Sequence, residues 1–133
     1  MTRSRMIPAA IVVGLFLLLG IGLATGVLGN VATAERDLDL DPERACAALR
    51  AAAVTMPRWA EVAAPGSLSL HYEARTKVAG FVDDVRLEVS PRPGGAHLRV
   101  RSSSREGLWD LGTNGRRVRA FLGALDAELA KKR

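Results

Sequence analysis

The sequence predicts an α+β protein in which an N-terminal transmembrane helix precedes one small two-layer domain. The chain is uncharged from Met6 to Leu28. Beyond residue 41, apolar residues recur first with the helical period of 3.6, then with the strand period of 2, and finally with the helical period again. The chain has 133 residues, so the part after the apolar segment suffices for one compact domain. Its single cysteine, Cys46, excludes an internal disulfide framework and any multi-cysteine metal site.

The apolar segment is long enough to cross a membrane. As a helix, Met6 to Leu28 would measure about 34 Å, against a hydrocarbon core of about 30 Å. Gly22 and Gly26 form a G-x-x-x-G pair, and Gly14 falls on the same helical stripe. Small residues in such a stripe let a second helix approach closely, although glycine is also common in membrane helices that have no partner.

The charges on either side of this segment predict its orientation. Arg3 and Arg5 precede it, whereas residues 35–43 carry five acids and one arginine. The positive-inside rule then makes residues 1–28 a cytoplasmic stub and anchor, and the rest of the chain periplasmic or otherwise extracytoplasmic. The alternative is a signal peptide cleaved after Ala34, but its apolar run would exceed the usual length of about 7–15 residues, which favours the anchor.

The residues after the anchor differ in charge from the domain. Residues 29–41 show no apolar periodicity and carry many acids, which predicts an acidic tether of at most about 43 Å. Residues 42–133 form the predicted domain and hold most of the basic residues of a chain whose net charge is +5.

Helices are predicted at both ends of the domain. Asp41 and Pro42 suit an N-cap and a first helical position, so we expect a helix from there to about Thr55. A second helix is expected over residues 115–130, where apolar residues recur at helical spacing.

The segment between the helices is predicted to form strands. Residues 68–75, 85–90 and 97–101 alternate apolar and polar side chains, and residues 59–63 form a weaker candidate. We therefore expect an antiparallel sheet of three or four strands with both helices on one face. The other face would carry His71, Glu73, Arg75, Arg86, Glu88, His97, Arg99 and Arg101.

Three ordered motifs accompany these elements. They read Phe81-Val82-Asp83-Asp84-Val85, then Arg101-Ser102-Ser103-Ser104-Arg105 with Gly107, then Asp110-Leu111-Gly112-Thr113-Asn114. Over about residues 42–127 the chain resembles domain-of-unknown-function family 1499, a family of bacterial and plastid proteins. The resemblance implies a small α+β domain, often behind a hydrophobic segment, and no established activity. The motif positions are Phe81, Asp83, Asp84, Arg101, Ser102, Ser104, Arg105, Gly107, Asp110, Leu111, Gly112 and Asn114.

The sequence carries no recognised catalytic motif. A nucleophile elbow, H-E-x-x-H, a P-loop and G-x-G-x-x-G are all absent, so we expect neither an enzyme nor a cofactor. The potential cation ligands are Asp83, Asp84, Asp110 and the two histidines, His71 and His97. Carboxylates beside an arginine-rich segment more often form ion pairs, so no metal site is expected. The basic residues alternate with acids and lack stacking aromatics, which argues against nucleic-acid binding.

Arg116 and Arg117 occupy the first turn of the second helix, where the helix dipole disfavours cations. Either an internal carboxylate compensates them, or an external anion such as a lipid phosphate binds there. The candidate anion or partner residues are Arg101, Arg105, Trp109, Asn114, Arg116 and Arg117. Trp109 itself is expected to pack over the sheet edge or to contact the membrane interface or a partner.

Together these patterns predict a single-pass, membrane-anchored, non-enzymatic interaction module. We expect it to act as an accessory or assembly subunit of a larger membrane protein complex. The alternative function is binding of an anionic lipid or small anion at the start of the C-terminal helix.

Overall fold

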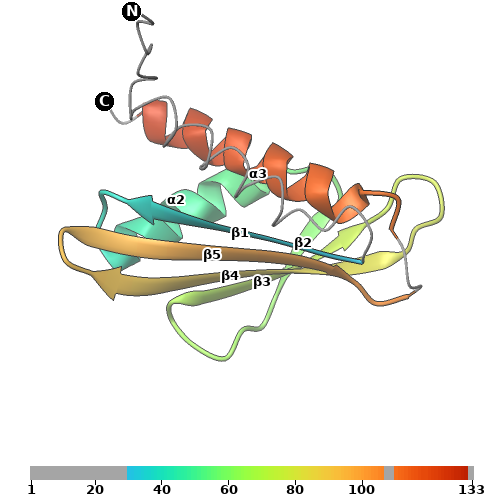
Figure 1. Cartoon of the computed structure of the whole chain (residues 1–133), viewed down its shortest axis with the longest axis horizontal. Helices are drawn as coiled ribbons and strands as arrows, with labels where there is room; N and C mark the ends of the chain where they lie inside the picture. The colour runs from blue at the N-terminus through green and yellow to red at the C-terminus, as the bar shows by residue number, and fades with distance from the viewer. Residues whose placement is uncertain (1–29, 107–109, 132–133) are drawn as a thin grey trace, which may run out of the picture.

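The computed structural model describes residues 30–106 and 110–131, which form two layers. The elements are β1 (Val31–Leu38), α2 (Pro42–Val54), β2 (Trp59–Val62), β3 (Ser69–Arg75), β4 (Val82–Arg92), β5 (Gly95–Ser104) and α3 (Thr113–Ala130). The strands form one antiparallel sheet in the order β1-β5-β4-β3-β2. Both helices lie on one face of this sheet, as predicted, and none of the described elements covers the other face (Figure 1).

The predicted strand number was wrong, because the sheet has five strands. The additional strand is β1, which lies where the sequence indicated an acidic tether, and it pairs along its whole length with β5. Its inward positions include Ala32, which is small, and Arg36, which pairs with Asp126 of α3. Because its inward residues are small or charged, hydropathy hardly alternates along β1. The sequence pattern therefore did not indicate a strand there.

Helix α2 begins as predicted. The Asp41 side chain accepts a hydrogen bond from the Arg44 amide at 3.0 Å, and Pro42 occupies the first turn. The face that packs on the sheet consists mostly of alanine, with Leu49 fully buried. Small side chains allow this helix to approach the sheet closely, and Cys46 is buried among them.

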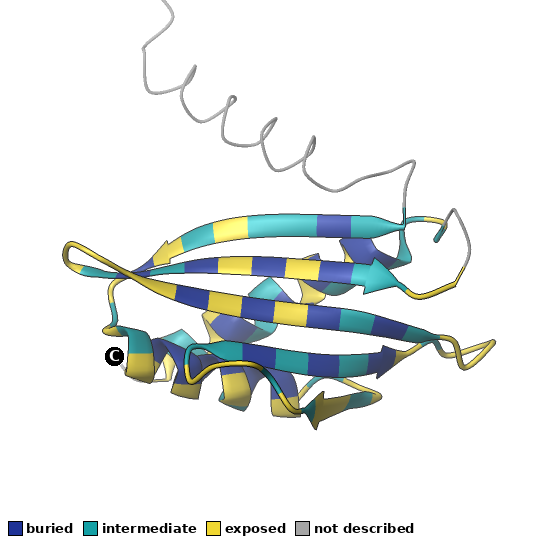
Figure 2. Ribbon diagram, turned by 90° about the horizontal axis from the view of Figure 1, so that it is seen from below, coloured by how far each residue is buried: buried dark blue, intermediate teal, exposed yellow. Residues whose placement is uncertain are grey.

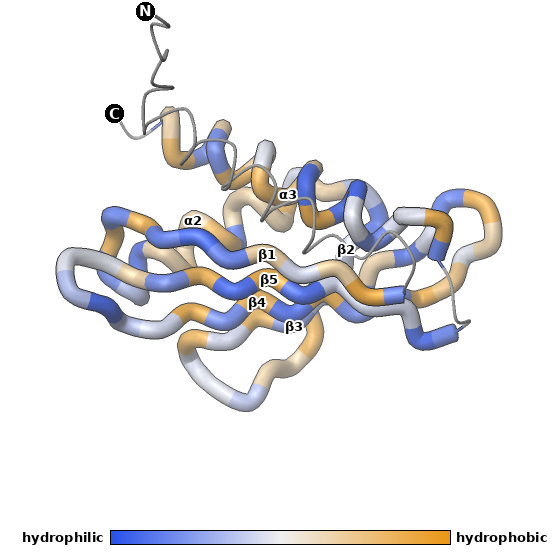
Figure 3. The backbone as a smooth tube through the Cα atoms, viewed as in Figure 1, coloured by the Kyte–Doolittle hydropathy of each residue, from blue (hydrophilic) through white to orange (hydrophobic). Residues whose placement is uncertain are grey.

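The alternation in β3, β4 and β5 places apolar side chains toward the helices and charged ones away from them. Figure 2 shows the alternation of buried and exposed residues along each strand, and Figure 3 shows the matching alternation of hydropathy. Leu87, Leu98 and Val100 are fully buried beneath the helices. The predicted polar face is therefore the open face of the sheet.

Helix α3 packs over this core through Phe121, whose ring stacks on Trp59 with a centroid separation of 5.5 Å. It begins at Thr113, two residues before the predicted start. Among residues 30–106 and 110–131, no helix is long and apolar enough to cross a membrane. The predicted anchor with Gly14, Gly22 and Gly26, and also Gly107 and Trp109, lie outside the described residues.

Candidate functional site

A buried polar cluster of Asp83, Ser102, Asn114 and Arg117 lies beneath the first turns of α3. Asp83 and Ser102 point toward the helices because they share a face with the apolar residues of β4 and β5. An Arg117 guanidinium nitrogen (Nη1) lies 2.7 Å from Asp83 Oδ2, and both side chains are at most 9% exposed. Asp83 Oδ2 accepts no well-aligned hydrogen bond from the described residues, so the contact with Arg117 is mainly electrostatic.

Asn114 is the centre of this cluster. Its Oδ1 accepts hydrogen bonds from Ser102 Oγ at 2.6 Å and from Arg117 Nη1 at 2.9 Å. Its Nδ2 has two hydrogens and lies within hydrogen-bond distance, 2.6–2.9 Å, of the Asn30 carbonyl, Ser104 Oγ and the Asp110 carboxylate. One side chain therefore joins the start of β1, the end of β5 and the start of α3.

Asp110 satisfies the first amides of α3. Its carboxylate accepts hydrogen bonds from the Gly112 amide at 2.8 Å and the Asn114 amide at 3.0 Å. Leu111 and Gly112 lie between these groups with φ values of 54° and 77°. The left-handed turn brings the carboxylate back to the helix and leaves Leu111 66% exposed. The start of α3 thus has an internal anion, one of the two alternatives that the sequence left open.

Asp84, the neighbour of Asp83, belongs to a second cluster on the open face of the sheet, which we call the outer ion-pair cluster (His71, Glu73, Asp84 and Arg105). Arg105 bonds both Asp84 oxygens and Glu73 at 2.8 Å, and His71 Nε2 lies 2.7 Å from Asp84 Oδ1. The hydrogen bonds from Arg105 are the main reason that the pKa of Asp84 falls from 3.8 to about 2. Asp84 therefore stays ionised except in strong acid.

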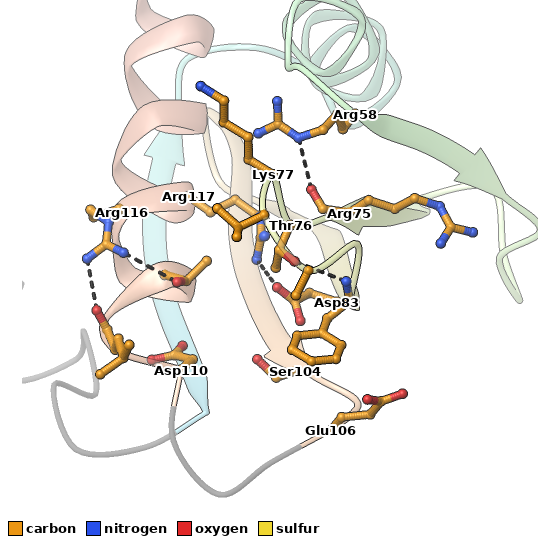
Figure 4. Close-up of a pocket in the computed structure, with 15 residues that line it drawn as sticks. Arg58, Arg75, Thr76, Lys77, Asp83, Ser104, Glu106, Asp110, Arg116 and Arg117 are labelled. Atoms are coloured by element: carbon orange, nitrogen blue, oxygen red, sulfur yellow. Dashed lines mark hydrogen bonds and ion pairs between the residues drawn. The ribbon is translucent and has the colours of Figure 1, made fainter.

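A cavity of about 780 Å³ adjoins the buried polar cluster at the same end of the sheet. Four cationic side chains in its lining, which we call the basic rim, are Arg58, Arg75, Lys77 and Arg116. They come from the turn before β2, the end of β3, the β3–β4 loop and α3. In Figure 4, Arg58 and Lys77 lie together at one end of the lining, Arg116 lies on α3, and the Arg75 side chain extends away from the others.

The basic rim lacks carboxylate partners. Arg58 and Arg75 donate to backbone carbonyls, and Arg116 donates to the Leu111 carbonyl and to Thr113 Oγ1. Within the described parts of the chain, no acid lies within ion-pair distance of these four cations. Of the acidic residues in the lining, Asp83 and Asp110 have internal partners, and Glu106 lies across the cavity from Arg58 and Lys77 (Figure 4).

Apolar side chains stand beside the basic rim. Val78 in the β3–β4 loop is 98% exposed, and Phe81 and Leu111 are 51% and 66% exposed. We call these three residues the apolar fringe; all of them line the cavity. The cavity therefore combines unpaired positive charge with exposed hydrocarbon.

The residues predicted for anion or partner binding do not form one site. Arg116 lies in the basic rim, whereas Arg117 and Asn114 are in the buried polar cluster. Arg105 and Arg101 lie on the open face, where Arg101 donates to Ser103 Oγ. The carboxylates considered as cation ligands also lie apart: Asp83 is in the buried polar cluster, Asp84 is on the open face, and Asp110 is at the start of α3. The described residues contain no group of three metal-ligating side chains.

A protein-family model matches most of the chain. The model of the family described as "Protein of unknown function (DUF1499)" matches residues 30–125. The chain belongs to the DUF1499 family. No curated protein matches it.

Three solved structures show the fold of this DUF1499 domain. Protein MLL2253 from Mesorhizobium loti is 16% identical with a TM-score of 0.57, and the match covers 77% of this chain and 98% of that protein. Protein CV1439 from Chromobacterium violaceum is 14% identical with a TM-score of 0.56, covering 76% and 95%. An uncharacterised protein from Rhizobium leguminosarum is 15% identical with a TM-score of 0.52, covering 76% and 94%.

Residues of all three sequence motifs meet in the buried polar cluster and the outer ion-pair cluster. The first aspartate of the Phe81-x-Asp-Asp-Val motif faces inward and the second faces outward, while Ser102, Ser104, Asp110 and Asn114 meet around α3. These motif residues hold the domain together at one end. The basic rim was mostly missed from sequence, because Arg58 lies in a turn and is separated from Arg75 and Lys77, which lie at the end of β3 and in the following loop. The basic and apolar residues in the segment 75–81 were the available signal.

Proposed function

We propose that this DUF1499 protein is a single-pass, membrane-anchored and non-enzymatic interaction module, an accessory or assembly subunit of a larger membrane complex. Residues 1–28 are its cytoplasmic stub and transmembrane helix, and the folded domain lies outside the cytoplasm. The observation that carries this proposal is the position of β1. It begins at Val31, only two residues after the apolar segment, and is hydrogen-bonded into the sheet along its full length.

This continuity supports a fixed position for the domain. A flexible tether would let the domain sample a large volume, whereas a sheet strand that starts beside the anchor holds it at the membrane surface. The open face of the sheet is then available for a protein partner. It carries charged side chains of both signs, including Arg86, Glu88 and Arg101, which suits a specific polar interface.

The anchor and its orientation can be tested with single cysteines. In a Cys46→Ala background, we expect Glu88→Cys to react with a membrane-impermeant maleimide in intact cells and Thr2→Cys to react only after permeabilisation. The protein should also stay in the membrane fraction after alkaline carbonate extraction. Release by carbonate, or the reverse labelling pattern, would contradict the proposal.

A partner on the open face can be tested with site-specific photo-crosslinking. A photo-crosslinking residue at Arg86 or Arg101 should give the same adduct with one membrane protein. The control is Arg119, which is exposed on α3 on the helical side. A chain that migrates as a lone monomer in mild detergent, with no adduct from either position, would contradict a role as a subunit.

A second candidate function is binding of a small anion or an anionic lipid. The basic rim favours it, and it moves the predicted site from the start of α3 to the neighbouring cavity, because Asp110 already satisfies the helix start. Inorganic phosphate should then bind the wild type and the Arg86→Glu variant, and bind Arg116→Glu more weakly. Equal binding by all three would remove this candidate.

A further inference from the structure

The chain enters the domain at the cavity end. The Asn30 carbonyl accepts hydrogen bonds from the Ser104 amide at 2.8 Å and from Asn114 Nδ2 at 2.9 Å. Ser104 itself lines the cavity. The start of β1, the β3–β4 loop and the start of α3 therefore lie at one end of the sheet, in the views of both Figure 1 and Figure 2.

The short connection determines which part of the domain faces the membrane. From Leu28 to Val31 the chain can extend by only about 10 Å. The predicted tether of 29–41 would have allowed about 43 Å and any orientation of the domain. With an anchor that ends near Leu28, the cavity end must lie within reach of the lipid headgroups, and the β4–β5 turn must lie at the far end.

The charges at this end complement an anionic membrane. The basic rim has four cations whose hydrogen-bond partners, where present, are neutral carbonyl and hydroxyl groups. Basic groups close to a membrane surface gain favourable interaction with anionic headgroups, and they lose it within about a Debye length. On the open face at this end, Arg105 differs from the basic rim because it is already paired with Asp84 and Glu73.

The apolar fringe fits the same surface. Val78 and Phe81 project from the β3–β4 loop, and Leu111 projects from the left-handed turn before α3. Three of the four large apolar side chains exposed in the described residues thus line one cavity. Exposed hydrocarbon flanked by arginine and lysine is typical of segments that enter the headgroup region of a bilayer.

We propose that the cavity end of the domain rests on the lipid bilayer, with the basic rim contacting anionic headgroups and the apolar fringe entering the interface. This inference rests on the proposed membrane anchor and specifies the orientation of the domain on it. The sheet then stands away from the bilayer, and its open face is presented sideways to a neighbouring subunit.

The test uses the full chain in vesicles and two labelled positions. In a Cys46→Ala background, an environment-sensitive fluorophore is attached at Val78→Cys in the fringe or at Ser90→Cys, which is exposed near the far end of β4. In phosphatidylglycerol vesicles we expect the Val78 label to be blue-shifted and quenched by nitroxide lipids, and the Ser90 label to remain in water. The expected quenching is at least roughly fivefold weaker in phosphatidylcholine vesicles, since several cations contribute.

The outcomes separate this inference from the proposed function. If the chain resists carbonate extraction but the Val78 label is as water-exposed as the Ser90 label, the orientation is wrong and the anchor stands. If carbonate releases the chain, the anchor fails and the orientation fails with it. Equal quenching of the Val78 label in both vesicle types overturns the role of the basic rim. If inorganic phosphate at constant ionic strength removes the contact between the Val78 label and the lipid, the cavity binds a soluble anion instead.

Discussion

Arg116 and Arg117 are neighbours in the first turn of α3, but their side chains belong to two regions with opposite electrostatics. Arg117 lies in the buried polar cluster, 2.7 Å from Asp83. Arg116 lies in the basic rim and bonds only neutral oxygens. The first arrangement fixes the geometry of the fold, because a buried charge requires its partner. The second leaves positive charge available to something outside the domain.

The largest expected effect comes from removing one half of the buried pair. Arg117→Leu leaves the Asp83 carboxylate buried without a countercharge, and the free energy of unfolding should fall by roughly 3–5 kcal/mol. Urea denaturation of the variant measures this. The double variant Asp83→Leu/Arg117→Leu is the control and should recover most of the loss. A single variant as stable as the wild type would show that the pair is not structural.

Asn114→Ala should have the next largest effect. It removes the side chain that joins β1, β5 and α3, and it leaves the buried Ser102 hydroxyl and the Arg117 guanidinium without one acceptor. A buried polar group that loses its partner costs about 1–3 kcal/mol, so we expect a loss in that range. Thermal unfolding provides the measurement, and Ser103→Ala on the open face is the matched control, expected to change stability by less than about 0.5 kcal/mol.

The outer ion-pair cluster predicts a smaller, pH-dependent effect. The folded-state pKa of Asp84 is about 2, below the value of 3.8, so its contribution is present above pH 3.8 and is lost as pH falls toward 2. In the Arg105→Ala variant the pKa of Asp84 should rise. The decrease in the free energy of unfolding on acidification should then be smaller by about 1–2 kcal/mol. Denaturation at several pH values tests this. If the free energy of unfolding of the variant falls with acid as steeply as that of the wild type, the prediction is contradicted.

The smallest effect concerns the β1 edge. His97 Nδ1 lies 2.7 Å from Asp37 Oδ1, and this hydrogen bond raises the pKa of His97 above 6.5. Because the folded-state pKa is raised, the interaction stabilises the domain below pH 6.5 and is lost as pH rises through the folded-state pKa. An NMR titration of the imidazole should show the raised pKa, and Asp37→Asn should return it toward its usual value.

The sequence predicted those elements whose local signals agree with their burial. Asp41 and Pro42 marked the start of α2, and the alternating residues of β3 to β5 marked strands and their inward faces. The same alternation could have predicted that Asp83 and Asp84 lie on opposite faces of the sheet. Asp83 lies two residues before Val85 and so shares its inward face. The membrane anchor and the function stay predictions.

Two features could not be predicted because they depend on tertiary contacts. Strand β1 has little hydropathic pattern of its own and is held by pairing with β5 and by Arg36 with Asp126. The basic rim assembles from the turn before β2, the end of β3 with the loop that follows it, and α3, which are three separate segments of the sequence. The motifs, in contrast, identified residues that meet in space, without indicating that most of them are structural.

The most direct test of the account compares stability and membrane contact in one variant, Arg116→Glu of the full chain. A carboxylate in the first turn of α3 suits the helix dipole, so the free energy of unfolding should stay the same or rise by about 0.3–1 kcal/mol. Contact of a Val78 label with phosphatidylglycerol vesicles should fall roughly tenfold or more, whereas the matched Arg86→Glu variant should retain it. Unchanged lipid contact in Arg116→Glu, or equal loss in Arg86→Glu, would contradict a membrane-facing basic rim.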